Sequence, residues 1–306
     1  MTTVLCLGEA LIDVVHAPGR EPSEFVGGSP LNVAGGLARL GHQTRLAAWF
    51  ATDTHGAKIQ RWLDEHAVLL AAGSDGAEST PTAIATLDEQ GQASYTFDLV
   101  WDLPEVDLDG IAHVHTGSIA AVLQPGADKV FDVLRRAKDA GATISYDPNM
   151  RPALMGHPDD VRGRVEQIIG LADVVKASDE DITWLYPDDV VEEVLELWVS
   201  MGPGLVVMTR GALGAVGLQP SSDTPITVEP RRVQSVDSVG AGDSFMAGLV
   251  SGLLDDDLLG TPQASSALYR APESAVGQAL ARAATTSSIT VTHAGAYAPT
   301  RSELDS

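Results

Sequence analysis

Apolar residues along the chain fall into two alternating patterns, which predict two kinds of element. Continuous apolar runs of strand length predict buried strands; they occupy residues 4–11, 44–50, 112–118, 143–149, 173–178 and 204–211. Between them, apolar residues three or four positions apart predict helices, as in 57–67 and 126–141. Repeated strand–helix units predict an α/β fold in which helices flank both faces of a mostly parallel central sheet. No repeat or linker interrupts this order, so we expect a single domain over residues 1–306.

Two parts of the chain break the strand–helix order. Residues 81–99 alternate apolar and polar positions around the turn Glu89-Gln90-Gly91-Gln92, which predicts a β-hairpin. The stretches 11–17 and 23–28 are also strand-like. We expect segments 11–28 and 81–100 to form a small β lid outside the main sheet. Ligands of parallel sheets bind beyond the carboxyl ends of the strands, so the site is expected at that edge.

The chain is strongly acidic, and its charge narrows the classes of partner. Its 306 residues are 44% apolar and carry a net charge of −23, which permits a large core but argues against nucleic acid or an anionic membrane as a partner. A phosphate site would have to act locally, through backbone amides, a metal ion and a few cations. No apolar run reaches the length of a membrane span, no basic leader opens the sequence, and the lone Cys6 excludes an intrachain disulfide. We expect a cytoplasmic protein.

Polar residues near the N-terminus stand where a small polar ligand could bind. Asp13 follows the first strand, and its carboxylate could accept hydrogen bonds from two neighbouring hydroxyls, the pattern that a polyol presents. Further on, Gly28 would let the backbone approach a ligand, Ser29 suits a helix N-cap, Pro30 suits the first helical position, and Asn32 lies in the first turn. An ordinary turn residue and an ordinary capped helix are the alternatives, and the residues alone leave both open.

The stretch Asp-Ser-Val-Gly-Ala-Gly-Asp-Ser-Phe (237–245) changes from a glycine-rich turn into a helix at about Gly242. The amides of Gly240, Ala241 and Gly242 would point from the positive end of that helix and could hold an anion. Asp243 is favoured in a first helical turn, yet it would repel an anion placed there. The conflict disappears if its carboxylate faces the attacking hydroxyl and takes the proton, while the amides stabilise a transferring phosphoryl group. No P-loop pattern occurs.

These stretches resemble the signatures of a known enzyme family. Residues 27–41 and 237–245 resemble the two signatures of the PfkB (ribokinase-like) carbohydrate kinases, and 8–14, 146–152 and 206–218 resemble other segments of that family. The resemblance covers essentially the whole chain and is strongest to fructokinases. It implies a ribokinase-like fold and ATP-dependent phosphorylation of a sugar's primary hydroxyl, best matched by fructose to fructose 6-phosphate. In some relatives the lids pair, which would make the protein a homodimer.

The resemblance also implies roles for individual residues. Asp243 would be the catalytic base beside an anion hole of Gly240, Ala241 and Gly242. The sugar would be held by Asp13, Gly28 and Asn32, with Arg151 approaching the substrate or the phosphates. Thr209 and Gly211 would line the nucleotide site, and Asp237 begins a stretch that holds a monovalent cation such as K⁺ through backbone oxygens.

One motif departs from the family pattern. The family's Asn-x-x-Glu motif, tied to Mg²⁺ and phosphate placement, is Ser178-Asp179-Glu180-Asp181 here. Asp181 can serve Mg²⁺ through water, whereas Ser178 lacks the donor and the reach of an amide. Lys176 is a candidate phosphate cation, and a solvent-exposed lysine without a ligand is the alternative.

Other interpretations of the sequence remain open. Within the family, 2-keto-3-deoxygluconate, another ketose or a nucleoside could be the substrate. A non-catalytic sugar-binding module is a second class, disfavoured by the complete 240–243 segment. A dinucleotide-binding dehydrogenase would need Gly-x-Gly-x-x-Gly after the first strand, which is absent. His113 and His115 alternate with apolar residues, which predicts strand residues rather than a metal-binding pair.

Overall fold

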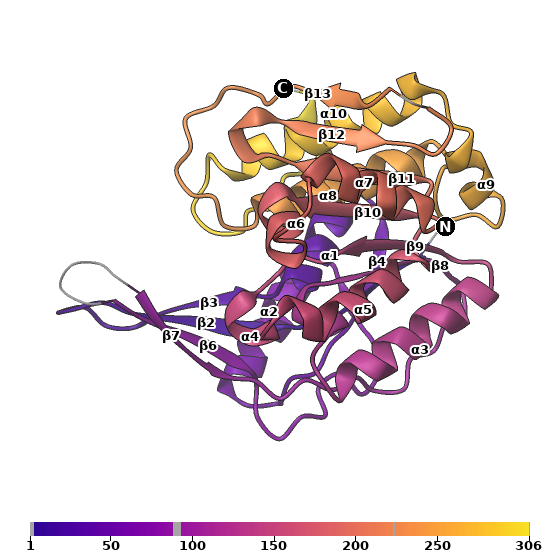
Figure 1. Ribbon diagram of the computed structural model, residues 1–306. Coiled ribbons are helices and arrows are strands. Elements are labelled where there is room, and N and C mark those ends of the chain that lie inside the picture. The colour runs from indigo at the N-terminus through magenta and orange to yellow at the C-terminus, as the bar shows by residue number, and fades with distance from the viewer. Residues whose placement is uncertain (1–2, 88–92, 223, 306) are drawn as a thin grey trace.

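A nine-stranded sheet forms the centre of the molecule (Figure 1). The computed structural model describes residues 3–87, 93–222 and 224–305. In spatial order the strands are β13 (Ile226–Val228), β12 (Ala215–Leu218), β11 (Leu205–Thr209), β10 (Val174–Ser178), β9 (Thr143–Asp147), β8 (Ile111–Gly117), β1 (Thr3–Leu7), β4 (Gln43–Ala47) and β5 (Leu69–Leu70). The seven neighbouring strands β11, β10, β9, β8, β1, β4 and β5 pair in parallel, and β12 and β13 add an antiparallel edge. The predicted mostly parallel sheet is confirmed.

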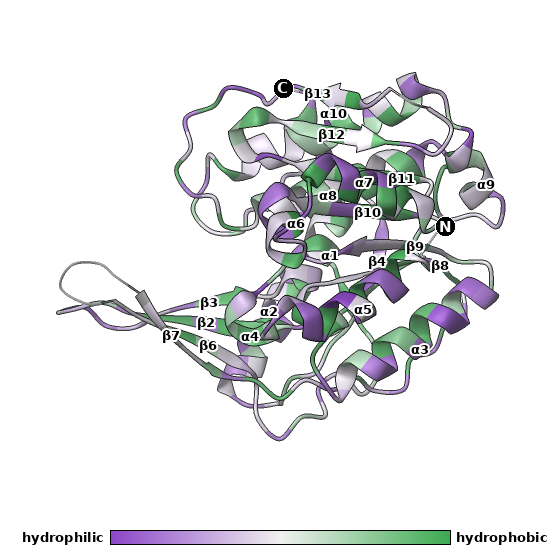
Figure 2. Ribbon diagram, viewed as in Figure 1, coloured by the Kyte–Doolittle hydropathy of each residue, from purple (hydrophilic) through white to green (hydrophobic). Residues whose placement is uncertain are grey.

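Helices cover both faces of this sheet, and each face has its own apolar core. Successive side chains along a strand point alternately into one core and the other. Leu5 and Leu7 of β1 pack into one apolar cluster, whereas Val4 and Cys6 pack into the other. The first cluster includes residues of α3 (Gly126–Asp139), α5 (Pro158–Ile169), α6 (Asp179–Leu185) and α7 (Val191–Ser200). The second includes residues of α1 (Ser29–Arg39), α2 (Thr54–Glu65), α8 (Ala241–Asp255) and α10 (Glu273–Thr290). Apolar residues therefore follow the inner strands and helix faces, and hydrophilic residues follow the outer faces (Figure 2).

A second, four-stranded sheet projects from one side of the main body (Figure 1). Its order is β3 (Ser23–Gly27), β2 (Leu11–His16), β6 (Thr82–Leu87) and β7 (Ala93–Asp98). These strands come from the two segments that the sequence separates from the main sheet. The predicted turn at 89–92 lies outside the described residues.

Several boundaries differ from the sequence prediction. The apolar run 4–11 is divided between two sheets, because β1 ends at Leu7 and β2 begins at Leu11. Three short helices, α4 (Pro152–Met155), α9 (Ala264–Tyr269) and α11 (Arg301–Leu304), were not predicted; one to two turns are too short to show a helical period. In the described part of the chain, no helix has the length and apolarity needed to cross a lipid bilayer.

Helices α8 and α10 pack so closely that a small residue is needed at their contact. A Cβ at Gly252 of α8 would lie 2.8 Å from the Cα of Ala279 on α10. We expect Gly252→Ala to lower the free energy of unfolding by about 1–3 kcal/mol, since the helices must separate to accept the methyl group. Urea denaturation measures this, with Gly277→Ala as the matched control. The nearest atom to a Cβ at Gly277 is 3.9 Å away, so that variant should be neutral or slightly stabilising; equal losses in both variants would contradict the argument.

Candidate active site

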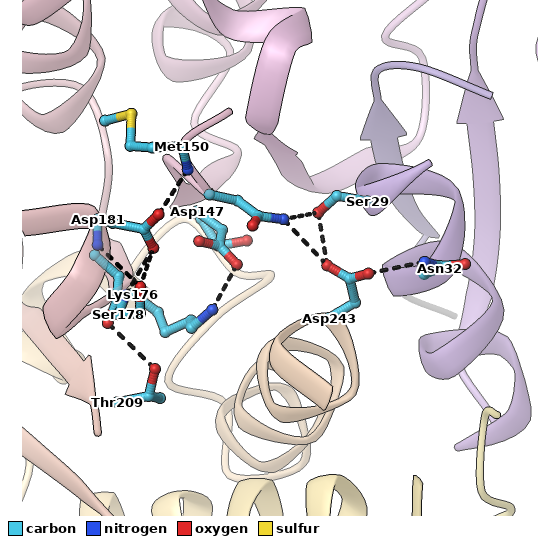
Figure 3. Close-up of polar contacts among 12 residues, drawn as sticks. Ser29, Asn32, Asp147, Met150, Lys176, Ser178, Asp181, Thr209 and Asp243 are labelled. Atoms are coloured by element: carbon cyan, nitrogen blue, oxygen red, sulfur yellow. Dashed lines mark hydrogen bonds and ion pairs between the residues drawn. The ribbon is translucent and has the colours of Figure 1, made fainter. Parts of the chain in front are cut away.

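Three of the predicted site residues, Ser178, Thr209 and Asp243, lie at the carboxyl ends of the parallel strands together with Asp147, an acid not predicted for the site (Figure 3). Asp147 ends β9, Ser178 ends β10 and Thr209 ends β11. Asp243 approaches the same region from the first turn of α8. Residues far apart in sequence are thereby brought together, because the carboxyl ends of parallel strands lie along one edge.

Helix α8 begins at Ala241, with Gly240 in the left-handed conformation as its N-cap (φ 75°). The amide of Ala241 donates to the Ser238 carbonyl at 3.2 Å, so it is not open to an anion in this conformation. Within the described residues, the amides of Gly240, Gly242 and Asp243 have no acceptor. The helix terminus thus presents three free N–H groups at its positive end, which suits a phosphate oxygen.

The carboxylate of Asp243 is buried, with 7% of the residue exposed, and polar side chains surround it. Ser29 donates its hydroxyl proton to Oδ1 at 2.7 Å, and Asn32 donates through Nδ2 to Oδ2 at 2.8 Å. Asn149 donates to the Ser29 hydroxyl at 2.8 Å and reaches Oδ1 at 3.4 Å. Because Ser29 and Asn32 both lie in the first turn of α1, this helix and α8 contact each other directly at the Asp243 carboxylate (Figure 3).

The prediction that Ser29 caps α1 is wrong. The helix begins at Ser29 itself, its N-cap is Gly28 with φ 125°, and no side chain caps it. The Ser29 hydroxyl is engaged by Asp243 instead. Gly28 is needed for close approach, since a Cβ there would lie 2.2 Å from the Glu9 carbonyl oxygen.

Two acids stand near the expected sugar side. Asp13 lies within β2 of the small sheet, opposite Phe25, and not at the edge of β1. Burial raises the pKa of Asp13, and the charge of Arg151 opposes that shift. Glu9, which sequence reasoning missed, is buried and accepts the Ser29 amide at 3.3 Å. Burial raises the pKa of Glu9 to about 7; an acid directly after a buried strand was the available signal.

Lys176 is buried in an ion pair, so its interpretation as a solvent-exposed lysine is wrong. Its ammonium donates to Asp147 Oδ2 at 2.8 Å, and the two residues are 3% and 0% exposed. Burial raises the pKa of Asp147 to about 6, although the Lys176 charge holds it down. For Lys176, burial opposes the charged form, but Asp147 and Asp181 outweigh it and the pKa is raised. Lys176 Nζ also lies 3.2 Å from where a Cβ on Gly242 would be, beside the free amides of α8.

Ser178 and Asp181 form a capping box at the start of α6. Asp181 Oδ2 accepts from the Ser178 amide and hydroxyl at 2.8 and 2.7 Å, while Oδ1 accepts from the Met150 amide at 2.7 Å. One acceptor position on Oδ1 remains. Among the described residues no group of three or more His, Cys, Asp or Glu side chains could hold a metal ion. This donor set fits Mg²⁺ bound mainly to nucleotide phosphates and water, not a cage of carboxylates.

In the described structure, His113 and His115 of β8 form hydrogen bonds with neighbouring hydroxyls and belong to no metal-binding cluster. His113 contacts the hydroxyls of Thr143 and Ser145 at 2.8 Å, and His115 contacts Ser145 at 3.0 Å. Both are fully buried, and burial lowers the pKa of each to about 3. They are neutral residues of β8, as the alternating pattern predicts.

The remaining predicted residues border the site. Thr209 donates to the Ala177 carbonyl at 3.4 Å, and Gly211 begins an exposed 3₁₀ turn, Gly211–Leu213. The Asp237 carboxylate accepts the amides of Gly295 at 2.8 Å and Val239 at 3.0 Å. Those bonds, the Gly295 bond foremost, lower the pKa of Asp237. They join the turn before α8 to the loop after α10.

Known proteins with similar sequences and structures agree with this architecture. The family description "pfkB family carbohydrate kinase" matches residues 1–303. A fructokinase of Klebsiella pneumoniae is 32% identical over 292 residues, which cover 92% of each chain. A fructokinase of Xylella fastidiosa with bound ATP superimposes with a TM-score of 0.85 at 27% identity, over 99% of this chain and 96% of that one.

A second solved structure carries a sugar. A fructokinase double mutant of Vibrio cholerae O395, in its fructose-, ADP- and potassium-bound form, superimposes with a TM-score of 0.80 at 29% identity, over 100% of this chain and 97% of that one. The match of the family description over nearly the entire length confirms the resemblance read from the sequence. The chain belongs to the pfkB family of carbohydrate kinases.

Proposed function

We propose that this protein transfers the terminal phosphoryl group of ATP to the primary hydroxyl of fructose, giving fructose 6-phosphate. The observation that carries the proposal is the placement of Asp243 at a helix terminus where three amides have no acceptor among the described residues. An acceptor hydroxyl and a phosphoryl group can then be held by neighbouring groups of the same turn. The fructokinase names of the relatives support fructose as the substrate.

The chemistry follows from the groups at the start of α8 and from Lys176 of β10. The Asp243 carboxylate removes the hydroxyl proton as that oxygen attacks phosphorus in line. The amides of Gly240, Gly242 and Asp243 and the ammonium of Lys176 stabilise charge on the transferring group. Bound Mg²⁺ would neutralise the nucleotide phosphates, with Asp181 contributing through water.

The sugar and nucleotide sides of the site have different donors. Asp13, Gly28, Asn32 and Arg151 are proposed to hold the sugar, while Thr209 and Gly211 border the nucleotide. The four-stranded sheet carries Asp13, and we propose that it closes as a lid to exclude water, which competes as acceptor. Asp237 orders the loop that would hold K⁺, in line with the potassium-bound relative.

We also propose a cellular location and a mode of pairing for this protein. The lone Cys6 is buried and unpaired, which supports a cytoplasmic location. Pairing of two chains through the four-stranded sheet stays a prediction; Phe25 on β3 is 55% exposed and would lie in such a contact.

A phosphorylation assay over a sugar panel tests the function. We expect the highest kcat/KM with fructose, and a product carrying phosphate on O6. The panel includes 2-keto-3-deoxygluconate, ribose, adenosine and glucose at equal concentrations, with each product position determined by NMR. A higher kcat/KM for another sugar would replace fructose but keep the kinase. If the protein turns over no ATP with any sugar of the panel, the result would favour the non-catalytic sugar-binding module.

A further inference from the structure

The two oxygens of the Asp243 carboxylate have different surroundings. Oδ1 accepts from Ser29 at 2.7 Å and lies 3.4 Å from Asn149 Nδ2, so both of its acceptor positions are engaged by protein donors. Oδ2 accepts from Asn32 at 2.8 Å, and among the described residues it has no second donor. One acceptor position on Oδ2 is therefore left for a substrate hydroxyl.

The hydrogen bonds that engage Oδ1 run in one direction. Arg151 Nη1 donates to Asn149 Oδ1 at 2.6 Å, and a guanidinium can only donate. The amide of Asn149 is thereby oriented with Nδ2 toward Ser29, at 2.8 Å. The Ser29 oxygen accepts from Asn149, so its single proton goes to Asp243. The orientation of every group in this series follows from the arginine at its start.

The backbone also holds Asn149 in place for this contact. Asn149 has φ 37°, a left-handed conformation that asparagine adopts more readily than most residues. The same Arg151 Nη1 donates to the carbonyls of Asn149 and Met150, at 3.1 and 2.9 Å. Arg151 itself is exposed, whereas Ser29 is buried. The series therefore runs from the surface of the site to the buried acid.

We propose that Arg151, Asn149 and Ser29 form a directed relay that occupies Oδ1 of Asp243 and leaves Oδ2 to take the proton of the attacking hydroxyl. Ser29 and Asn149 are then positioning residues. In the transfer step the hydroxyl O–H bond breaks, its proton moves to Oδ2, the oxygen bonds to phosphorus, and the bond from phosphorus to the leaving ADP oxygen breaks. This inference rests on the proposed role of Asp243 as the base.

Steady-state kinetics of relay variants test the positioning role. We expect Ser29→Ala to lower kcat for fructose by about 10- to 100-fold, the effect of losing a hydrogen bond to a charged group, with KM for fructose nearly unchanged. Ser29→Thr retains the hydroxyl and should restore most of the activity. Ser251→Ala is the matched control: this buried serine of α8 bonds to His42 and Arg282, remote from the acid, and its kcat should equal that of the unaltered protein.

A second substitution separates a relay from independent contacts. Asn149→Gly removes the amide but tolerates the left-handed backbone. In the Ser29→Ala background it should reduce kcat by a smaller factor than it does alone, because the relay is already broken and only the longer direct contact of Asn149 with Oδ1, at 3.4 Å, is left to lose. Multiplicative losses would mean that the two residues act separately. A raised KM with unchanged kcat in Ser29→Ala would make Ser29 a sugar contact and overturn the relay.

The outcomes for the two proposals can be told apart. If the unaltered protein phosphorylates no sugar, the proposed function fails; if it is active and Ser29→Ala equals it, the relay alone fails. The melting temperature of each variant identifies loss of folding. A crystal structure with fructose and a non-hydrolysable ATP analogue checks the oxygen directly. The reacting hydroxyl is expected beside Oδ2, and its placement beside Oδ1 with Ser29 displaced would overturn the assignment.

Discussion

Replacing Asp243 with asparagine is expected to lower kcat for fructose by about 10²- to 10⁴-fold, the range that general bases contribute. The amide has nearly the shape of the carboxylate but cannot accept the hydroxyl proton. Sugar binding should persist, because Asn32 and the backbone at Gly28 remain. Initial-rate kinetics with fructose and ATP give kcat, and equilibrium titration gives the fructose Kd.

The control for this variant lies at the other end of the same helix. Asp256 is exposed at the C-cap of α8, and Asp256→Asn makes the same chemical change without touching the site. It should retain full turnover. Near-normal turnover in Asp243→Asn would mean that another group accepts the proton, and the assignment of the base would be lost.

Replacing Lys176 with methionine is expected to lower the free energy of unfolding at pH 8 by about 3–5 kcal/mol, the cost of breaking a buried ion pair. Asp147 is fully buried, so the variant leaves its carboxylate without a counter-charge. Because the folded-state pKa of Asp147, about 6, lies above its ordinary 3.8, ionisation costs stability as pH rises from about 4 to 6. Loss of the ammonium enlarges that cost, so the variant should be less impaired at pH 5 than at pH 8.

Urea unfolding at pH 5 and pH 8 measures both quantities. Lys129→Met is the matched control, since Lys129 pairs with Asp102 but its side chain is 52% exposed; it should lose less than about 1 kcal/mol. Adding Asp147→Asn to Lys176→Met should recover part of the lost stability, because the buried charge is gone. Equal losses of stability for the two lysine variants, or a larger loss for Lys176→Met at pH 5 than at pH 8, would contradict the conclusion that the buried Asp147 carboxylate depends on Lys176 for its counter-charge.

The start of α8 could be predicted from sequence because its signals are local. A glycine-rich turn, small residues and an acid in the first turn occupy adjacent positions, and the helix begins within one residue of the prediction. The capping box of Ser178 and Asp181 also has a local pattern, an acid three residues after a serine. The family resemblance assigns these two residues to Mg²⁺ and phosphate placement, whereas the local pattern predicts the hydrogen bonds that the structure shows.

The partners of Asp243 could not be predicted in this way. Ser29 and Asp243 are 214 positions apart, and a serine before Pro30 fits a local N-cap equally well. Tertiary structure supplied a stronger acceptor than the backbone of α1. Asn149 lies in the segment 146–152 that resembles the family, but its amide is a weaker signal in the sequence than the charge of Arg151 two positions later.

Lys176 is an intermediate case. It lies in an apolar run of strand length, 174–178, which predicts burial on both faces. A buried lysine requires a counter-charge, and Asp147 ends the neighbouring strand. The pair was therefore accessible to reasoning from strand order, but strand order is itself a property of the fold.

The bonds from Asp237 to Gly295 and from the amides of Val236 and Asp237 to the Val291 carbonyl have a consequence for synthesis of the chain. They attach the turn that enters α8 to the loop after α10, which is translated more than fifty residues later. The nine strands of the large sheet, by contrast, are complete once Val228 has been translated. On the ribosome, the sheet can form early, whereas the turn that presents the amides proposed to bind phosphate gains this anchor only after Gly295 has been translated. A chain released before residue 295 would retain all the strands but lack that anchor.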